Sequence, residues 1–214
     1  MTKSSSKEAP AFENCTEIAT IIVGVERKKW TIPTDLLCFH SGYFRSALKG
    51  GFAEAKTKTV ELLEEQPAAF ELVVEWLYTH AIGARLPNED EEEQSAKIGR
   101  LLDTWVLSEY LQMPKLQNII IRLMSDQLTR LEAIPIEEFD RVCGVVSSNS
   151  PLYTWMGKYA IWVLSDDDCF YDDCIEKSAV HLLVNVCQKL QVKRRITDNK
   201  RPIYVSCLVD EPED

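Results

Sequence analysis

The fold is decided by the stretch IPTDLLCFHSGYFRSAL, residues 32–48, in which the end of a strand passes directly into a helical pattern. Behind the proline, apolar side chains and one serine recur every three or four residues, at Leu37, Ser41, Phe44 and Leu48. This is the period of an α-helix that buries one face. Two glycines follow at positions 50 and 51, where glycine commonly ends a helix. The stretch therefore predicts one continuous helix from Leu36 to Lys49.

Two short strands are predicted before this helix and one after it. Thr20–Val25 is a β-branched run, and Lys29–Ile32 follows after a short charged break. Such a pair fits two strands joined by a tight turn. Thr59–Leu62 alternates polar and apolar residues and predicts a third strand. Between the helix and the third strand, Phe52–Ala55 is predicted to lie in a loop.

Only helices are predicted beyond the third strand. Pro67 suits the first position of a helix that an apolar stripe carries to about Tyr78. Further helical patterns cover Ile98–Leu111, Leu116–Leu128, Glu137–Val146, Pro151–Leu164 and about Ile175–Leu190. The five consecutive acids Glu89–Glu93 are interpreted as a solvated loop. Strands gathered at the front and helices behind them indicate an α+β fold rather than a doubly wound α/β sheet.

Four segments are predicted along the chain. Residues 1–17 are rich in Lys, Ser, Glu and Pro and are interpreted as a disordered leader. Residues 18–131 hold the strands and the first helices and are predicted to form one domain. Residues 132–192 are predicted to be a helical extension. Residues 193–214 form a tail, in which the alternation of Ile203–Val209 is consistent with one short strand.

Composition disfavours several classes of partner. The chain carries 34 acidic and 24 basic residues, for a net charge of −10. Nucleic acids and anionic membranes bind through Lys and Arg, so neither partner is expected. No apolar run approaches the roughly 18 residues of a membrane helix, and the first ten residues lack the apolar core of a secretory signal. Seven cysteines without such a signal indicate reduced thiols in the cytoplasm or the nucleus.

No catalytic or metal-binding motif stands out, so the chain is predicted not to be an enzyme and to hold no metal or cofactor. The three histidines, His40, His80 and His181, are not paired at metal-ligand spacing. Cys169 and Cys174 form one close pair, whereas a structural zinc site commonly needs two pairs, so they are interpreted as unlinked thiols. Neither a glycine-rich phosphate loop nor a Gly-x-Ser-x-Gly elbow occurs.

The stretch 32–48 resembles the signature of the BTB/POZ family, which runs as a strand, Val-His-Lys, an apolar pair, and Ser-x-Tyr/Phe-Phe. The matching residues are Asp35, Leu36, Leu37, Ser41, Tyr43 and Phe44. Gly51–Ala55 resembles the family's Gly-Phe-x-Glu loop, and Phe70–Thr79 resembles its closing helix with a Leu-Tyr-Thr end. Cys38 and the Glu-Trp-Leu-Tyr-Thr sequence are typical of filamentous-fungal members. One departure is Ile32-Pro33 in place of Val-His, where the proline removes a backbone donor.

The resemblance implies a BTB/POZ fold, a small three-stranded sheet flanked by a helical cluster, over residues 18–131, with an all-helical C-terminal extension. It also implies a protein–protein interaction module. The family's cullin-docking loop carries an apolar residue, any residue and then Glu, which Phe52, Ala53 and Glu54 satisfy. Asp35 and Tyr43 are the further candidate contact residues. The competing interpretation is that Phe52 packs on its own domain while Glu54 is merely solvated.

Three functions remain open on this resemblance. The first is a substrate-recruiting adaptor that docks on a cullin-type ubiquitin ligase scaffold. The second is a homo-oligomerisation or scaffold module without a role in ubiquitin transfer. The third is a transcriptional or scaffold cofactor, whose role would be indirect because the sequence shows no zinc finger and no basic DNA-reading helix. Many dimeric members carry an extra N-terminal helix, for which only Phe12 and Cys15 are candidate anchors here. The helices of residues 136–164 extend a cullin contact in one interpretation and cap the core in the other.

Overall fold

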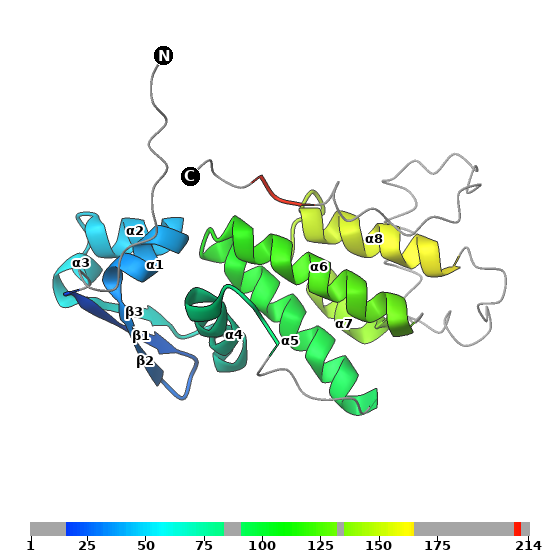
Figure 1. Ribbon diagram of the computed structural model, residues 1–214, viewed down its shortest axis with the longest axis horizontal. Coiled ribbons are helices and arrows are strands. Elements are labelled where there is room, and N and C mark those ends of the chain that lie inside the picture. Colours follow the sequence, from blue (N-terminus) through cyan, green and yellow to red (C-terminus); the bar gives the residue numbers. More distant parts are fainter. Residues whose placement is uncertain (1–15, 84–90, 132–134, 165–207, 211–214) are drawn as a thin grey trace, which may run out of the picture. The chain divides into compact units, whose positions relative to one another are not determined.

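A computed structural model describes the chain at residues 16–83, 91–131, 135–164 and 208–210 (Figure 1). Several sequence predictions lie outside these residues. They are most of the leader, the helix at Ile175–Leu190, the Cys169–Cys174 pair, His181 and most of the strand at Ile203–Val209. The end of that last stretch is described, and Leu208 and Val209 carry no regular secondary structure.

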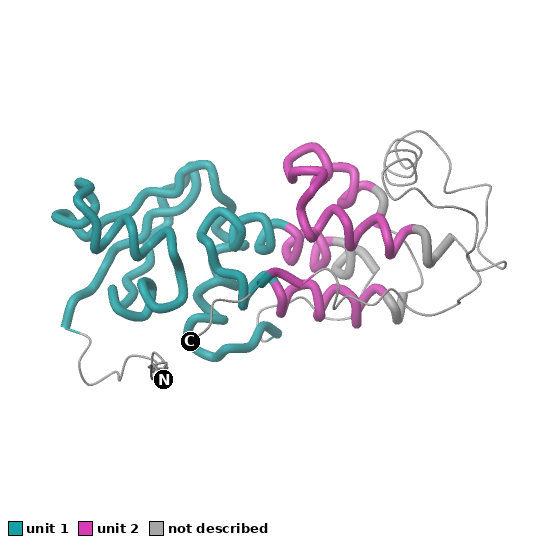
Figure 2. Tube along the Cα trace, turned by 90° about the horizontal axis from the view of Figure 1, so that it is seen from above, with its two compact units in different colours: residues 1–86, 103–117, 210–214 teal, residues 87–102, 118–209 magenta. Residues whose placement is uncertain are grey.

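The chain forms two compact units (Figure 2). The first comprises residues 1–86, 103–117 and 210–214, and the second comprises residues 87–102 and 118–209. Two helices, α5 (Glu91–Tyr110) and α6 (Pro114–Leu131), contribute to both units. The predicted domain of residues 18–131 contains both helices in full, whereas the compact units divide each of them.

The first unit is built on a three-stranded sheet with the order β2-β1-β3. Its strands are β1 (Ile18–Val23), β2 (Lys28–Pro33) and β3 (Thr59–Leu62), so all three predicted strands are found. Strand β1 lies in the centre, antiparallel to β2 and parallel to β3. It is mostly buried, as its β-branched composition suits. The sheet therefore has its most apolar strand in the position that is paired on both edges.

The predicted continuous helix over residues 36–49 is wrong, because the chain breaks at Ser41. Helix α1 spans Thr34–His40 and helix α2 spans Gly42–Lys49, with an extended backbone at Ser41 between them. The fully buried Ser41 hydroxyl accepts from the Phe44 N–H at 3.1 Å and donates to the Leu111 carbonyl at 2.6 Å. Ser41 thus caps α2 while it binds a residue 70 positions away.

The break between α1 and α2 packs closely on the turn between α5 and α6. The N–H of Gly42 donates to the Gln112 carbonyl at 3.3 Å, and the N–H of Tyr43 donates to the Leu111 carbonyl at 3.4 Å. A Cβ atom at position 42 would overlap the Gln112 side chain. Glycine is therefore required there by the close approach of the two segments rather than by its backbone angles.

Two further element predictions need correction. Residues 53–57 form the short helix α3 (Ala53–Thr57) rather than a loop, and it ends at Lys58 in the left-handed conformation. Helix α5 begins at Glu91, inside the acidic run that was predicted to be a loop. Acidic residues at a helix N-terminus interact favourably with the helix dipole, and glutamate is a good helix former. Charge alone therefore did not make this run a loop.

Helix α4 (Pro67–Thr79) begins at the predicted proline and supplies much of the core of the first unit. Its buried residues include Phe70, Leu72, Val73 and Trp76. The glycine that follows β1, Gly24, has a positive φ of 74°, and a Cβ there would lie 2.8 Å from the ring of Pro67. The turn between β1 and β2 is thereby held against the start of α4.

The second unit contains the two helices predicted for the extension, α7 (Ile136–Cys143) and α8 (Pro151–Leu164). The predicted cap of α8 is confirmed, since the Ser150 hydroxyl accepts from the Tyr153 N–H at 3.1 Å. In the core of this unit, the rings of Trp155 and Tyr159 stack at 5.8 Å. Both ring polar atoms are satisfied on α6, by the Ser125 hydroxyl and the Leu128 carbonyl. None of the described helices has the length and apolar character of a membrane span.

We expect Ser41→Ala to lower the free energy of unfolding by about 2 kcal/mol, because it removes a helix cap and a buried hydrogen bond together. Urea denaturation followed by tryptophan fluorescence measures the change. The matched control is Ser46→Ala on the exposed face of α2, which should stay within about 0.5 kcal/mol of the parent chain. Equal midpoints for the two variants would contradict the structural role given to Ser41.

Candidate protein-binding surface

Phe52 stands exposed at the start of α3. Its side chain is 63% exposed, and its extended backbone forms the N-cap position of the helix. A Cβ at Gly50 would lie 3.3 Å from the Phe52 ring, so the ring is seated next to that glycine. An aromatic side chain exposed to this extent has a large apolar area left to bury. The structure thus does not support the interpretation that Phe52 packs into its own domain.

Glu54 lies half-buried in the first turn of α3, two residues after Phe52, and Ala53 between them is exposed. Its own backbone carbonyl accepts from the N–H of Lys58 at 2.8 Å, which closes the helix. Within the ranges that the structure describes, no ion pair involves the Glu54 carboxylate. The backbone at Glu54 is therefore fixed by a closed helical turn, and no ion pair among the described residues compensates the charge of its carboxylate.

Tyr43 joins this loop to the end of α5. Its ring lies 4.9 Å from the ring of Tyr110, which is 50% exposed as the last residue of α5. Burial raises the pKa of the Tyr43 phenol, and the hydrogen bond with Tyr110 and the charge of nearby Glu54 raise this pKa further. Tyr43 is therefore neutral at physiological pH. We call Tyr43, Phe52, Glu54 and Tyr110 the docking face.

Tyr110 was not singled out in the sequence. It lies 67 residues from Tyr43, and nothing in the local pattern of either segment marks the other as a neighbour. The contact arises because Ser41 and Gly42 hold the residues that follow Tyr110, namely Leu111 and Gln112. The docking face is thus assembled by the break between α1 and α2.

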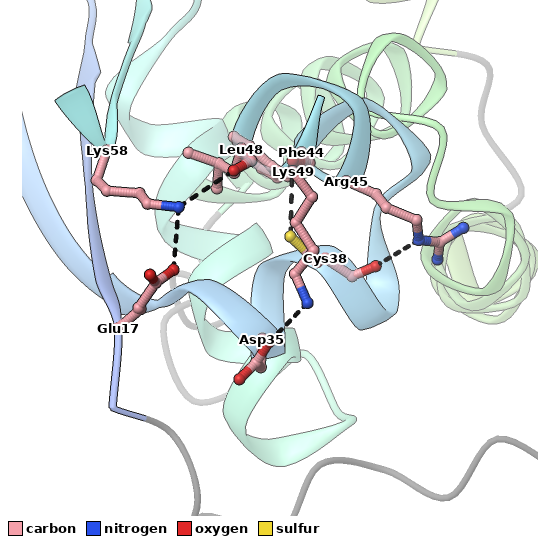
Figure 3. Close-up of polar contacts among 8 residues, drawn as sticks. All are labelled: Glu17, Asp35, Cys38, Phe44, Arg45, Leu48, Lys49 and Lys58. Carbon is pink, nitrogen blue, oxygen red and sulfur yellow. Dashed lines mark hydrogen bonds and ion pairs between the residues drawn. The ribbon is translucent and has the colours of Figure 1, made fainter. Parts of the chain in front are cut away.

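Asp35, the fifth candidate residue, lies away from Tyr43, at the other end of the α1–α2 pair. Its carboxylate accepts from Lys49, the last residue of α2, at 2.7 Å (Figure 3). Tyr43, by contrast, is near the start of that helix. The hydrogen bond with Asp35 raises the pKa of Lys49. Both side chains are substantially exposed, so the pair adds little stability. The structure thus gives Asp35 a partner within its own domain.

Around this ion pair, charged side chains close off the ends of α1 and α2 (Figure 3). Lys58 binds the Glu17 carboxylate at 3.0 Å and donates to the Leu48 carbonyl at 3.2 Å. Arg45 donates to the Cys38 carbonyl at 2.9 Å and so satisfies the C-terminal end of α1. The side chains of Lys49, Lys58 and Arg45 therefore bind acids or backbone carbonyls within the domain.

The two described cysteines are not activated. The Cys38 thiol is buried and donates to the Phe44 carbonyl at 3.6 Å, and burial raises its pKa. Burial, together with nearby Asp140, raises the pKa of Cys143 to about 11. Both thiols are therefore protonated at neutral pH and pack as small apolar groups, whereas a reactive cysteine needs a thiolate.

The structure brings together two histidines that are far apart in the sequence. The rings of His40 and His80 lie 5.1 Å apart, each at the end of a helix, and Trp76 lies 5.0 Å from His40. Their spacing of 40 residues gave no sign of this pairing. Across the described ranges, no cluster of three or more His, Cys, Asp or Glu side chains could hold a metal ion. We therefore interpret the pair as part of the aromatic packing between α1 and α4.

Comparison with known proteins agrees with the fold described above. A family model of the BTB/POZ domain matches residues 11–128, which is more than half of the chain. A search of the curated proteins finds no match. The matched residues include the three-stranded sheet, the Ser41 break and all four residues of the docking face. The chain belongs to the BTB/POZ domain family, and its BTB domain is a protein–protein interaction module of a generally non-enzymatic kind.

Proposed function

We propose that the chain is a substrate-recruiting adaptor of a cullin-type ubiquitin ligase and that the docking face binds the cullin. The observation that carries the proposal is the exposed ring of Phe52 next to the uncompensated carboxylate of Glu54. These residues occupy the apolar and acidic positions of the loop through which members of the family dock on cullins. Ala53, the residue between them, is exposed as well.

The chemistry of the face suits a partner with an apolar pocket flanked by a cation. An aromatic anchor that fills such a pocket typically carries a large share of the binding energy. The adjacent acid then fixes orientation, because a misplaced partner would leave the charge unpaired. Tyr43 and Tyr110 extend the aromatic area, and tyrosine is enriched at interfaces. The net charge of −10 favours attraction to a basic partner surface over longer distances.

Substrate recruitment in this proposal falls to the helices of the second unit. Helices α7 and α8 follow the matched family region and carry no element of the docking face. Val145, just after α7, is 69% exposed and is the one large apolar side chain of this unit that is strongly exposed among its described residues. An exposed apolar residue of this kind offers a partner a contact without disturbing the core.

Self-association is the second candidate function, and two exposed apolar residues favour it. Ile18 at the start of β1 is 57% exposed, and Val25 in the following turn is 91% exposed. Both lie outside the docking face. Ile18 and Val25 lie near opposite ends of β1, so each offers a separate apolar contact to a second copy, and isologous dimers are the commonest oligomers. Light scattering after size exclusion, with and without a cullin, separates this function from the adaptor role.

Phe52→Ala should weaken binding to a purified cullin N-terminal region by about 30-fold, the equivalent of roughly 2 kcal/mol for a lost aromatic anchor. Isothermal titration calorimetry measures the affinity. The control is Val25→Ala, which removes an exposed apolar side chain of the same unit outside the docking face and should leave the affinity unchanged. Unaltered binding by Phe52→Ala, or no cullin binding by the parent chain, would rule out the adaptor proposal.

Glu54→Gln should weaken the same complex by about 5-fold, and most of the loss should disappear at high salt because screening already removes the charge term. The substitution keeps the shape of the side chain and removes one negative charge. Its matched control is Glu26→Gln, which removes one charge from an exposed turn of the same unit. Stopped-flow association rates at two ionic strengths measure both variants, and equal losses for the two would show that only net charge matters.

A further inference from the structure

The second unit contains a buried amide, Asn118 on α6, that is 2% exposed. The amide binds the backbone of a residue 91 positions away. Its Nδ2 donates to the Val209 carbonyl at 2.9 Å, and its Oδ1 accepts from the Val209 N–H at 2.7 Å. A buried amide is costly unless it is hydrogen-bonded, so this two-point contact matters for the unit.

The geometry of this contact shows what Asn118 recognises. The N–H and C=O of one residue point to the same side when the backbone is extended, as in the hydrogen-bonded pairs of an antiparallel ladder. The amide of Asn118 takes the place of the opposite strand in such a pair. Both hydrogen bonds go to the backbone, so the contact recognises an extended chain with a free N–H rather than one particular side chain.

The bound segment also contributes apolar area. Leu208 and Val209 are half-buried, while Asp210 after them is exposed (red in Figure 1). The receptor residue lies within the region that the BTB/POZ family model matches, and the bound segment lies outside it. The contact therefore joins an element of the family domain to a short segment, two apolar residues followed by an acid, that arrives from elsewhere in the chain.

We propose that Asn118 is the receptor of a binding site for extended peptide segments and that Leu208–Asp210 is its occupant from the same chain. The tail segment acts as an internal blocker of this site. A segment of the same chemistry on another molecule, extended, with adjacent apolar residues and a free backbone N–H, binds only when the tail segment leaves. Tethering favours the chain's own segment, because a linked ligand has a high effective concentration.

The test uses the full chain and a fluorescent synthetic peptide of residues 206–214 in a reducing buffer. Val209→Pro removes the N–H that Asn118 accepts, so the tail segment of this variant no longer competes. We expect the peptide to bind Val209→Pro roughly 10-fold or more tightly than the parent chain, by fluorescence anisotropy. Val209→Ala keeps the N–H and should bind the peptide nearly as weakly as the parent chain does.

Two controls test the role of Asn118 itself. A peptide with proline at the position of Val209 should not bind any form of the chain. In the Val209→Pro chain, adding Asn118→Asp should abolish binding of the normal peptide, because a carboxylate replaces the amide donor that faces the carbonyl. Equal affinities for Val209→Pro and the parent chain, or binding of the proline peptide, would overturn the proposal.

A measurement without any variant protects the test against misfolding of Asn118→Asp. In the parent chain, hydrogen exchange of the Val209 amide, followed by NMR, should be slower by roughly 10-fold or more than in the free peptide. Exchange at the rate of the free peptide would overturn the proposal, whatever the variants show.

Discussion

One buried hydroxyl, that of Ser41, sets the arrangement on which the first unit depends. It donates to the Leu111 carbonyl and accepts from the Phe44 N–H, and none of its surface is exposed. A buried polar group with both kinds of bond made is rigid, because loss of either bond leaves an unsatisfied partner in the core. The direction of α2 and the position of the turn after α5 are therefore determined together. The contact of Tyr43 with Tyr110, and with it the docking face, therefore depends on the two hydrogen bonds of Ser41.

At the docking face, an aromatic ring is not buried and a carboxylate is not paired with a cation of the described structure. Several other charges of the first unit are paired, as in Asp35 with Lys49, Glu17 with Lys58 and Arg27 with Glu61. Its apolar side chains are mostly buried in the core. At Phe52 and Glu54 an aromatic ring is left exposed and a carboxylate is left without a cation in the described structure. Positions that break the local rules without a structural gain are the ones expected to serve a partner.

The elements that the sequence predicted are those whose signal is local. The strands and most helices follow from periodicity, and Pro67 and Ser150-Pro151 mark helix starts by their own chemistry. The break at Ser41 was not predicted, because Ser41 falls on the same helical face as Leu37 and Phe44. The break depends on a hydrogen bond to Leu111, a residue 70 positions away. The roles of Tyr110 and Asn118 were not predicted for the same reason, since each contacts a partner that is distant in the sequence. The motif at Phe52–Glu54 was visible, but its exposure was not.

The two candidate sites bind by different physics, and this has a consequence for how they combine. The docking face offers side chains, an anchor and a charge, so its specificity depends on the shape and charge of a pocket in the partner. Asn118 offers an amide that binds a backbone, so its specificity depends on conformation and on a free N–H. The docking face lies wholly in the first unit, and Asn118 and Val209 lie wholly in the second. The two sites share no residue and recognise their partners by different means, so the two proposals together predict partners that do not compete for the same side chains.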